Sequence, residues 1–435
     1  MSSKLALSLF QRLMKGGSVW AIADQVVVSA GNFATTLLLA RALVPAEFGT
    51  FVLINSACQI MIGFHGNLVV SPLVVLGASA STTKYRTYPT AALAFTLALL
   101  PVSFLVVFLA SASLHREVTG LLAVLYILAW QFQETTRRAL TSKLRYGDAI
   151  WGDSISYLGQ ALLVGLVFRH PGSTLNEAFT IMASATLGAA ALQCWQAKAV
   201  LMTWTELSNC GVEFWALGKW MIVVSLTSVA AGPLFPWFLN WFHGKEAVAS
   251  YQAVMNVLGL ANPLVISISA IVMPTAANWL NESSMQRSRS LYKLAMRYVL
   301  QFELLLAPWL LVLLAWPHSA LIAFYGKTTL YGGQTAALRV GVLVYVLTVP
   351  MTVFGAVLTG MGKTKSNAAM QVVGAGASLV CAPPLIFAGG VVGTMLAETV
   401  ARGSRVLYAA RSIRRFSAVN SIRETHTTEG RALKA

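Results

Sequence analysis

The chain has 435 residues, of which 57% are hydrophobic and only 11% are charged, and its formal net charge is +16. A soluble domain carries about 25% charged residues, so this composition excludes an ordinary soluble enzyme and indicates an integral membrane protein. The basic excess would suggest a nucleic-acid partner in a soluble chain. Here it lies between apolar segments, so we expect it to contact anionic lipid headgroups and no nucleic acid.

Twelve apolar segments follow one another along the chain. About 20 apolar residues cross the hydrocarbon as a helix, because only a helix satisfies its own backbone hydrogen bonds there. We predict spans at residues 19–40, 48–76, 89–111, 118–132, 153–168, 178–200, 220–241, 248–277, 294–316, 338–358, 368–388 and 391–408. The predicted fold class is an all-α polytopic membrane protein.

The positive charge alternates between the two sides of these spans. Both termini and every second gap, counted together with the span ends beside them, hold 25 of the 31 lysine and arginine residues. Basic loops stay in the cytoplasm, so we predict that both termini are cytoplasmic. The basic segment 137–145 falls in one of these gaps and is expected to be a loop that binds headgroups.

A faint repeat divides the chain near its middle. Glu47 and Glu246 each lie in a short turn after a span, and an aromatic residue, Phe51 or Tyr251, follows a few positions later. The repeat predicts two six-helix bundles related by a pseudo-two-fold axis, an architecture common in transporters. The expected segments are an amphipathic cytoplasmic helix at 1–17, a first lobe at 18–200, a cytoplasmic linker at 201–219, a second lobe at 220–410 and a polar, basic, disordered cytoplasmic tail at 411–435.

Asp24 is the most costly polar residue of the first span. A charge at mid-bilayer costs ~2.5–3.5 kcal/mol even on the insertion scale. It shares a helical stripe with Gly31, Asn32 and Thr35. Two interpretations are open: Asp24 faces a transport cavity and binds a proton, sodium or cargo, or it pairs with a basic residue of a neighbouring helix near the cytoplasmic edge.

Polar residues of later spans are further candidates for the cavity or for ion coupling. The full set is Asp24, Asn32, His65, Asn67, Asn256, Asn262, Glu303 and Glu398. His65 is suited to relay protons or contact a diphosphate, although a lone helical histidine more often packs and donates a hydrogen bond. Glu398 and Arg402 are spaced i, i+4, which allows an ion pair within one helix.

Basic residues at span ends are candidates for diphosphate contacts, because arginine binds phosphate oxygens bidentately. They are Arg41, Lys219, Arg297, Arg339 and Arg402. The alternative is that they anchor the spans at the interface. Prolines inside spans remove a backbone donor and are candidate hinges. These are Pro72, Pro263, Pro274, Pro350 and Pro383.

No motif for a cofactor, a metal or an enzyme active site is present. The four cysteines are scattered without a CxxC spacing, so we expect neither a metal site nor disulfides. The sequence contains no GxSxG, Walker A or HExxH motif. We therefore expect a transporter without a cofactor, coupled if at all to protons or sodium.

Several segments resemble one family in order along the chain. The segment LLLARALVPAEFGTFVL (37–53), the segment 243–277, and the pair Gly360–Lys365 and Gly389–Gly393 are similar to landmarks of bacterial polysaccharide and O-antigen flippases of the multidrug/oligosaccharidyl-lipid/polysaccharide exporter superfamily. The resemblance implies two bundles that rock around a cavity and move a polyprenyl-diphosphate-linked oligosaccharide across the bacterial inner membrane. It also implies polysaccharide polymerase and assembly proteins as partners.

The chain departs from the peptidoglycan-precursor branch of these flippases, which has fourteen helices and arginines early in helix one. This chain has room for twelve and places Asp24 there, which argues against that precursor as cargo. One alternative is a multidrug and toxin extrusion type exporter of small cations, which Asp24, Glu303 and Glu398 would suit. The other is a membrane glycosyltransferase or polymerase, which usually needs a large outer loop. The longest outer loop here, 317–337, contains no acidic residue.

Overall fold

Every regular element of the protein is a helix in the residues described by a computed structural model, which are 17–79, 82–169, 172–198, 200, 202–219, 221–230, 232–281, 291–327 and 329–432. The helix predicted for the N-terminal segment lies outside this range, except for Gly17. The chain folds as two compact units, whose described residues belong to Met1–Val229 (unit 1) and Ala230–Ala435 (unit 2).

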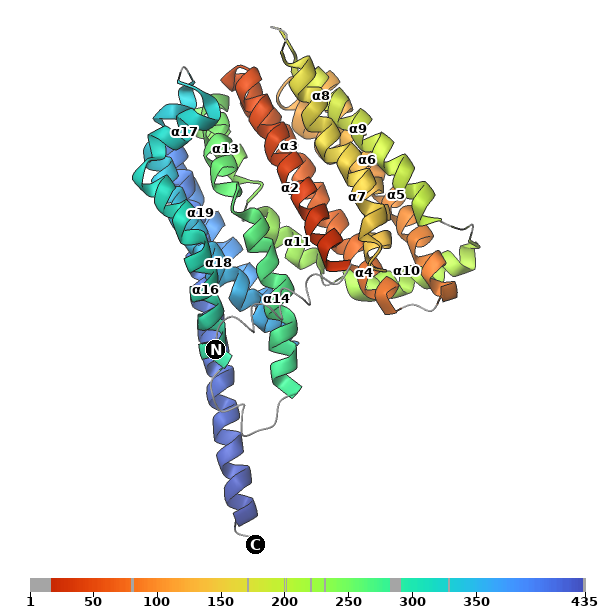
Figure 1. The fold of residues 1–435 in the computed structure, drawn as a ribbon, viewed down its shortest axis with the longest axis vertical. Helices are drawn as coiled ribbons and strands as arrows, with labels where there is room; N and C mark the ends of the chain where they lie inside the picture. Colours follow the sequence, from red (N-terminus) through yellow and green to blue (C-terminus); the bar gives the residue numbers. More distant parts are fainter. Residues whose placement is uncertain are drawn as a thin grey trace. The chain divides into compact units, whose positions relative to one another are not determined.

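Unit 1 is built around α6, which packs against α5, α9, α3 and α7; Figure 1 shows α5, α6 and α9 side by side. Two short π-helices, η1 and η2, interrupt its spans. The elements are α2 (Gly17–Ala42), α3 (Pro45–His65), η1 (Gly66–Val70), α4 (Ser71–Ser79), α5 (Thr82–Ala112), α6 (Glu117–Thr141), α7 (Tyr146–Asp153), η2 (Ser154–Leu158), α8 (Gly159–Val167), α9 (Leu175–Ala197), α10 (Trp204–Gly218) and α11 (Met221–Ala230).

Unit 2 centres on α18, which packs against α19, α14, α16 and α13. Its elements are α12 (Phe235–His243), α13 (Lys245–Gly259), α14 (Asn262–Asn281), α16 (Leu291–Ala315), α17 (Pro317–Tyr325), the 3-10 helix η3 (Leu330–Gly333), α18 (Thr335–Gly360) and α19 (Thr364–Ala432). Gly390 interrupts α19 with φ 51° and ψ −123°, a conformation that favours glycine. The break separates the two predicted spans at 368–388 and 391–408.

The predicted twelve spans fit the observed helices. Eight described helices are long and apolar enough to cross a membrane, and α13 with α14 forms one further span bent by 54°. Gly390 divides α19 into a first arm, 364–389, and a second arm, 391–432, which match two predicted spans. Helices α2 and α6 match the remaining two, although they do not pass the same test of length and hydropathy. The protein is therefore an all-α polytopic membrane protein.

The repeated turns occupy equivalent places in the two units. Glu47 lies in the first turn of α3 and Glu246 in the first turn of α13. An acidic side chain there interacts favourably with the helix dipole. Both helices are followed by a break in regular α-geometry, at η1 in one unit and at the 54° bend in the other. Superposition of 19–200 on 220–408 remains a prediction.

The segment 137–145 is not simply a basic loop, and this corrects our prediction. Helix α6 continues to Thr141, and Arg137 is only 7% exposed, so it is not available to lipid headgroups. Glu134 pairs with both Arg137 and Arg138 at the i+3 and i+4 positions. These pairs stabilise the additional helical turn and neutralise its charges locally.

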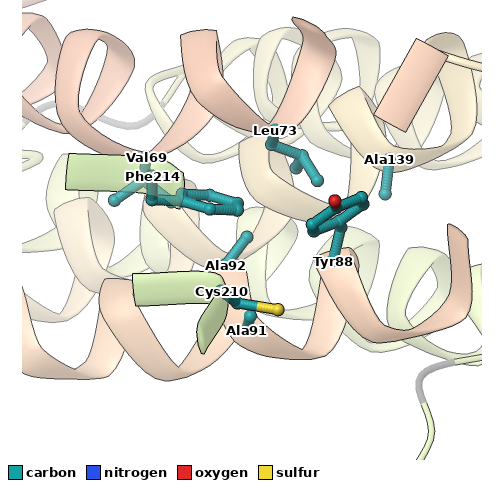
Figure 2. Close-up of a cluster of buried hydrophobic side chains, with 8 residues drawn as sticks. All are labelled: Val69, Leu73, Tyr88, Ala91, Ala92, Ala139, Cys210 and Phe214. Carbon is teal, nitrogen blue, oxygen red and sulfur yellow. The ribbon is translucent and has the colours of Figure 1, made fainter. Parts of the chain in front are cut away.

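The predicted linker 201–219 is a helix that belongs to unit 1. Thr203 and Glu206 form a capping box at the start of α10, and the Thr203 backbone amide holds the pKa of Glu206 below its usual value. Cys210 and Phe214 of α10 enter a buried apolar cluster with residues of η1, α4, α5 and α6 (Figure 2). The Tyr88 hydroxyl donates to Glu213 over 2.7 Å, which fixes α10 to α5.

The C-terminal tail also differs from expectation. We predict disorder from residue 411 onward, yet α19 continues as a helix to Ala432. The segment contains no proline, and its first glycine is Gly430, so no helix breaker interrupts it before the last turn. The Lys363 ammonium lies 4.9 Å from the centroid of the Phe416 ring in this extension.

Candidate functional site

A buried network of charges occupies the interior of unit 1, with Arg137 of α6 at its centre. The Arg137 guanidinium donates to Asp24 over 2.7 Å and to Asp153 over 2.5 Å. A third contact reaches Glu134 over 3.3 Å. Asp24, Asp153 and Arg137 are at most 7% exposed. Because Asp24 lies on α2, Arg137 and Glu134 on α6, and Asp153 on α7, the network ties three separate helices together.

Two glutamines complete the shell around Asp153. The side-chain amides of Gln133 and Gln193 donate to the same carboxylate oxygen of Asp153, over 3.2 and 3.1 Å. Gln193 also donates to the Ala149 carbonyl over 2.9 Å, which fixes the orientation of its amide. Asp153 therefore receives donors from a guanidinium and from two amides.

The network has more acceptors than donors. Three carboxylates, those of Asp24, Glu134 and Asp153, face the guanidinium groups of Arg137 and Arg138. One carboxylate oxygen of Asp24 and the amide oxygens of Gln133 and Gln193 are buried without a hydrogen-bond partner among the described residues. An unsatisfied buried acceptor costs about 1–3 kcal/mol. A bound proton or small cation would supply the missing donor or positive charge, so the arrangement suits reversible cation binding.

Close helix packing holds this network in place. A Cβ atom at Gly31 would lie 2.6 Å from the backbone of Tyr157, so only glycine lets α2 approach η2 this closely. Asp153 directly precedes the π-helix η2. Such π-turns alter the direction of the following side chains and occur frequently at functional sites.

His65 forms a second polar cluster in unit 1. It is fully buried, and its Nε2 atom lies 3.1 Å from the Thr96 hydroxyl and 3.0 Å from the Thr135 hydroxyl. Its Nδ1 atom is buried without a partner among the described residues. The ring also meets Trp130 edge-on at 6.3 Å between centroids. These contacts match the packed, hydrogen-bonded interpretation of this histidine.

Unit 2 holds a different buried cluster on the second arm of α19. Glu398 accepts a hydrogen bond from the Tyr251 hydroxyl over 2.5 Å and pairs with Arg402 over 2.7 Å. The expected i, i+4 pair is therefore present. Nearby, the Tyr345 hydroxyl donates to Asn262 over 2.7 Å. Glu398 is 4% exposed, so its charge is fully committed to these partners.

Arg405 lies one turn beyond this pair and was not among the predicted site residues. It is only 9% exposed, and its Nη1 atom lies 3.7 Å from the Met351 sulfur. Its Nε and Nη2 atoms have no hydrogen-bond partner among the described residues. Among the side chains that the structure describes, no carboxylate lies within ion-pair distance of this buried guanidinium.

The other predicted polar residues do not join one site. Asn32 is exposed, because it lies about 80° around α2 from Asp24, whereas Gly31 and Thr35 are buried on the Asp24 side. Asn67 donates to Ser225 over 2.8 Å and connects η1 to α11. Asn256 accepts from Gln252 over 2.8 Å, while its amide nitrogen has no partner among the described residues.

The predicted diphosphate contacts are dispersed as well. Arg41 lines a cavity of about 450 Å³ in unit 1 together with Arg169. Arg297 and Lys219 are exposed, and Arg339 donates to the Leu314 carbonyl over 3.4 Å. Their exposed positions also suit interface anchors.

Two of the predicted hinge prolines lie at breaks in the helices. Pro72 follows η1, where its missing amide donor helps to account for the π-turn, and Pro263 lies at the 54° bend between α13 and α14. The helices continue through Pro274, Pro350 and Pro383.

Sequence reasoning missed Glu134, Arg137, Asp153 and Arg405. One local signal existed: Glu134 precedes two arginines at helical spacing, a pattern typical of a helix rather than a loop. Asp153 also opens a predicted span. No local signal pairs Arg137 with Asp24, because 113 positions separate them.

The sequence matches no protein-family model and no curated protein. An inward-facing multidrug resistance MATE family transporter of the MOP superfamily has a similar structure, with a TM-score of 0.71 at 14% identity over 91% of this chain and 95% of its own. Lipid II flippase MurJ in an inward closed conformation is also similar, with a TM-score of 0.68 at 13% identity over 92% of this chain and 87% of its own. A MOP superfamily transporter from Pyrococcus furiosus has a TM-score of 0.63 at 13% identity over 93% of this chain and 95% of its own. The chain therefore has the fold of these transporters, with about twelve helices in two bundles.

Proposed function

We propose that this protein is a flippase that moves a polyprenyl-diphosphate-linked oligosaccharide across the bacterial inner membrane by alternating access of its two units. Its fold, shared with MOP superfamily transporters that include a lipid flippase, supports transport as the general activity. The resemblance of its sequence segments to polysaccharide and O-antigen flippases supports the cargo. Polysaccharide polymerase or assembly proteins would then act on the product.

The distribution of buried charge favours an anionic cargo. Two of the three acids that would suit a cationic cargo, Asp24 and Glu398, are already paired with arginines at 2.7 Å. Arg405, in contrast, is buried with two nitrogen atoms unpartnered among the described residues. A diphosphate accepts such charge-assisted hydrogen bonds well. This spare guanidinium is the observation that carries the choice of cargo.

The unit 1 network would couple transport to an ion. Its carboxylates exceed its guanidinium groups, and Asp24 retains an unpartnered oxygen. Binding of a proton, or of sodium, at Asp24 and Asp153 would weaken the ion pairs of these carboxylates with Arg137. Helices α2, α6 and α7 could then change their packing with the state of the site, which is the requirement for coupling.

The cargo is tested with purified protein in proteoliposomes that contain a fluorescent polyprenyl-diphosphate sugar. Exposure of the sugar to an impermeant lectin measures its transfer between leaflets. We expect transfer by the wild type and a large decrease in the Arg405→Gln variant at equal protein content. A wild-type protein that moves no lipid-linked sugar, but does move an organic cation, would reject the proposal.

Coupling is tested with Asp24→Asn, which keeps the side-chain shape and removes the charge. We expect normal abundance, slower transport per molecule and a flatter pH dependence. Glu47→Gln is the matched control, because Glu47 pairs with Arg116 at a partly exposed site outside the network. An Asp24→Asn protein with wild-type transport and the wild-type pH profile would return Asp24 to a purely structural role.

A multidrug and toxin extrusion type exporter of small cations is the second candidate. Glu303 lines a cavity of about 790 Å³ in unit 2, and no basic side chain among the described residues lies within ion-pair distance of it. At the apolar end of this cavity, away from Arg411 and Arg414, a carboxylate could attract an organic cation. Cation efflux that disappears in Glu303→Gln, while lipid-linked sugar stays in place, would favour this function.

A further inference from the structure

A groove of about 790 Å³ runs along unit 2 between α16, α18 and the second arm of α19. The three helices pack against one another, and Figure 1 shows them running together. The groove lies apart from the buried pair of Glu398 and Arg402, neither of which lines it.

One end of the groove is cationic. Arg411 and Arg414 of α19 line it there, and both are exposed. Arg414 donates to the Tyr292 hydroxyl over 2.7 Å, and its guanidinium lies 4.4 Å from the centroid of that ring. Neither arginine has a carboxylate within ion-pair distance among the side chains that the structure describes. Their donors can therefore bind an external anion, with Tyr292 holding Arg414 in place.

The walls of the groove are apolar. Met296 and Val299 follow Tyr292 along one face of α16, and Phe354 and Leu347 face them from α18. The surface beside the groove is also apolar, since Leu300 and Leu304 are 68% and 72% exposed. Exposure of such an apolar surface to water is unfavourable, so we expect the groove to open towards the hydrocarbon of the bilayer.

The groove has the length of a substantial part of one leaflet. Glu303 marks its deep end, eleven residues after Tyr292 on α16, which corresponds to about 16 Å along the helix. The cationic end lies on the side that the charge pattern assigns to the cytoplasm. A ligand with an anionic head at Arg411 and Arg414 and an apolar chain directed towards Glu303 would match this layout.

We propose that this groove binds an anionic glycerophospholipid of the cytoplasmic leaflet, with its phosphate between Arg411 and Arg414 and one acyl chain along α16. Arginine binds phosphate oxygens bidentately, and the apolar walls replace contacts with neighbouring lipids. The bilayer supplies this lipid at high local concentration. The bound lipid joins α16 to α18 and α19 and stabilises unit 2 in its membrane.

The test is native mass spectrometry of the full chain released from nanodiscs with equal amounts of phosphatidylglycerol and phosphatidylcholine. We expect phosphatidylglycerol to be retained preferentially by the wild type. The double variant Arg411→Gln/Arg414→Gln should reduce this retention by roughly thirtyfold, since each of the two arginines contributes about 1 kcal/mol towards an anionic lipid. Equal retention of the two lipids by the wild type would overturn the proposal.

Two variants separate the groove from general surface charge. Arg415→Gln removes an exposed arginine of the same helix that does not line the groove, and it should leave retention unchanged. Ala410→Trp fills the groove without changing charge and should lower retention. A loss in Arg415→Gln equal to that of the double variant, or full retention in Ala410→Trp, would refute the site.

Glu303→Gln identifies the class of ligand. The phosphate is expected at the opposite end of the groove, so retention of phosphatidylglycerol should not fall in this variant. A fall would mean that the ligand carries a cation at Glu303. Preferential retention of an isoprenyl phosphate added at the same amount as phosphatidylglycerol would overturn the assignment of the occupant. Because the assay measures lipid retention alone, its failure leaves the flippase proposal to its own transport test.

Discussion

Unit 1 and unit 2 both bury charged clusters, but the excess charge has opposite sign. In unit 1 three carboxylates face Arg137 and Arg138. In unit 2 Glu398 pairs with Arg402, while Arg405 forms no ion pair with any described side chain. A buried charge without a partner lowers the stability of the fold, so such charges usually have a function. The comparison shows that two bundles of one architecture bury different charges, and it is consistent with the proposed cation coupling in unit 1 and anionic cargo in unit 2.

The strongest test of this comparison removes Arg137. Arg137→Met leaves Asp24 and Asp153 buried without their shared cation, and breaking a buried ion pair costs about 3–5 kcal/mol. Thermal unfolding of the purified protein in detergent should show a large decrease in melting temperature. The control is Arg138→Gln, whose side chain is 42% exposed and whose loss should cost less than about 1 kcal/mol. Equal losses in the two variants would mean that the network is not the main ionic contact of unit 1.

A triple variant that restores the charge balance of the network separates the loss of charge from the loss of packing. Adding Asp24→Asn and Asp153→Asn to Arg137→Met removes the uncompensated charges, so part of the lost stability should return. If the triple variant is no more stable than Arg137→Met alone, lost packing rather than charge explains the first result.

The next test concerns helix packing and has a smaller expected effect. Gly31→Ala places a Cβ atom 2.6 Å from the Tyr157 backbone, so α2 must move and the cost should be about 1–3 kcal/mol. In unit 2, the three atoms nearest to a Cβ at Gly374 all belong to the Arg405 side chain, which has more freedom to shift than backbone, so the loss should be smaller. Gly165→Ala is the control, because its nearest atom is a Leu38 methyl carbon at 3.5 Å. Melting temperatures in the opposite order would show that the unit 2 contact is the more rigid one.

The smallest expected effect is a gain in stability rather than a loss. Arg405→Met removes two buried donors that have no described partner, so unfolding should become less favourable by about 1 kcal/mol while transport of the anionic cargo falls. Arg402→Met should instead lower stability, because Glu398 loses its guanidinium partner. The measurement is the melting temperature together with transport per molecule. A destabilised Arg405→Met protein with normal transport would assign Arg405 a structural role only.

The sequence by itself determined the membrane class, the number of spans and several local features. Hydrophobic length sets each span, because a bilayer-embedded backbone must be helical. Gly389 and Gly390 separate the last two spans, and the spacing of Glu398 and Arg402 predicts their pair. Each of these signals acts within a few turns of one helix and can therefore be read without knowing its neighbours.

The tertiary structure decided which charges are buried and with which partners. Arg137 belongs by sequence to a basic gap, yet packing of α2, α6 and α7 brings it to Asp24 across 113 positions. Asn32 shares a stretch of α2 with Asp24, but the helical rotation between them leaves it exposed. The same packing leaves Arg405 buried without an ion pair in the part of the chain that the structure describes. Long-range pairing depends on how helices pack across a bundle, and hydropathy and charge along one segment carry no information about that packing.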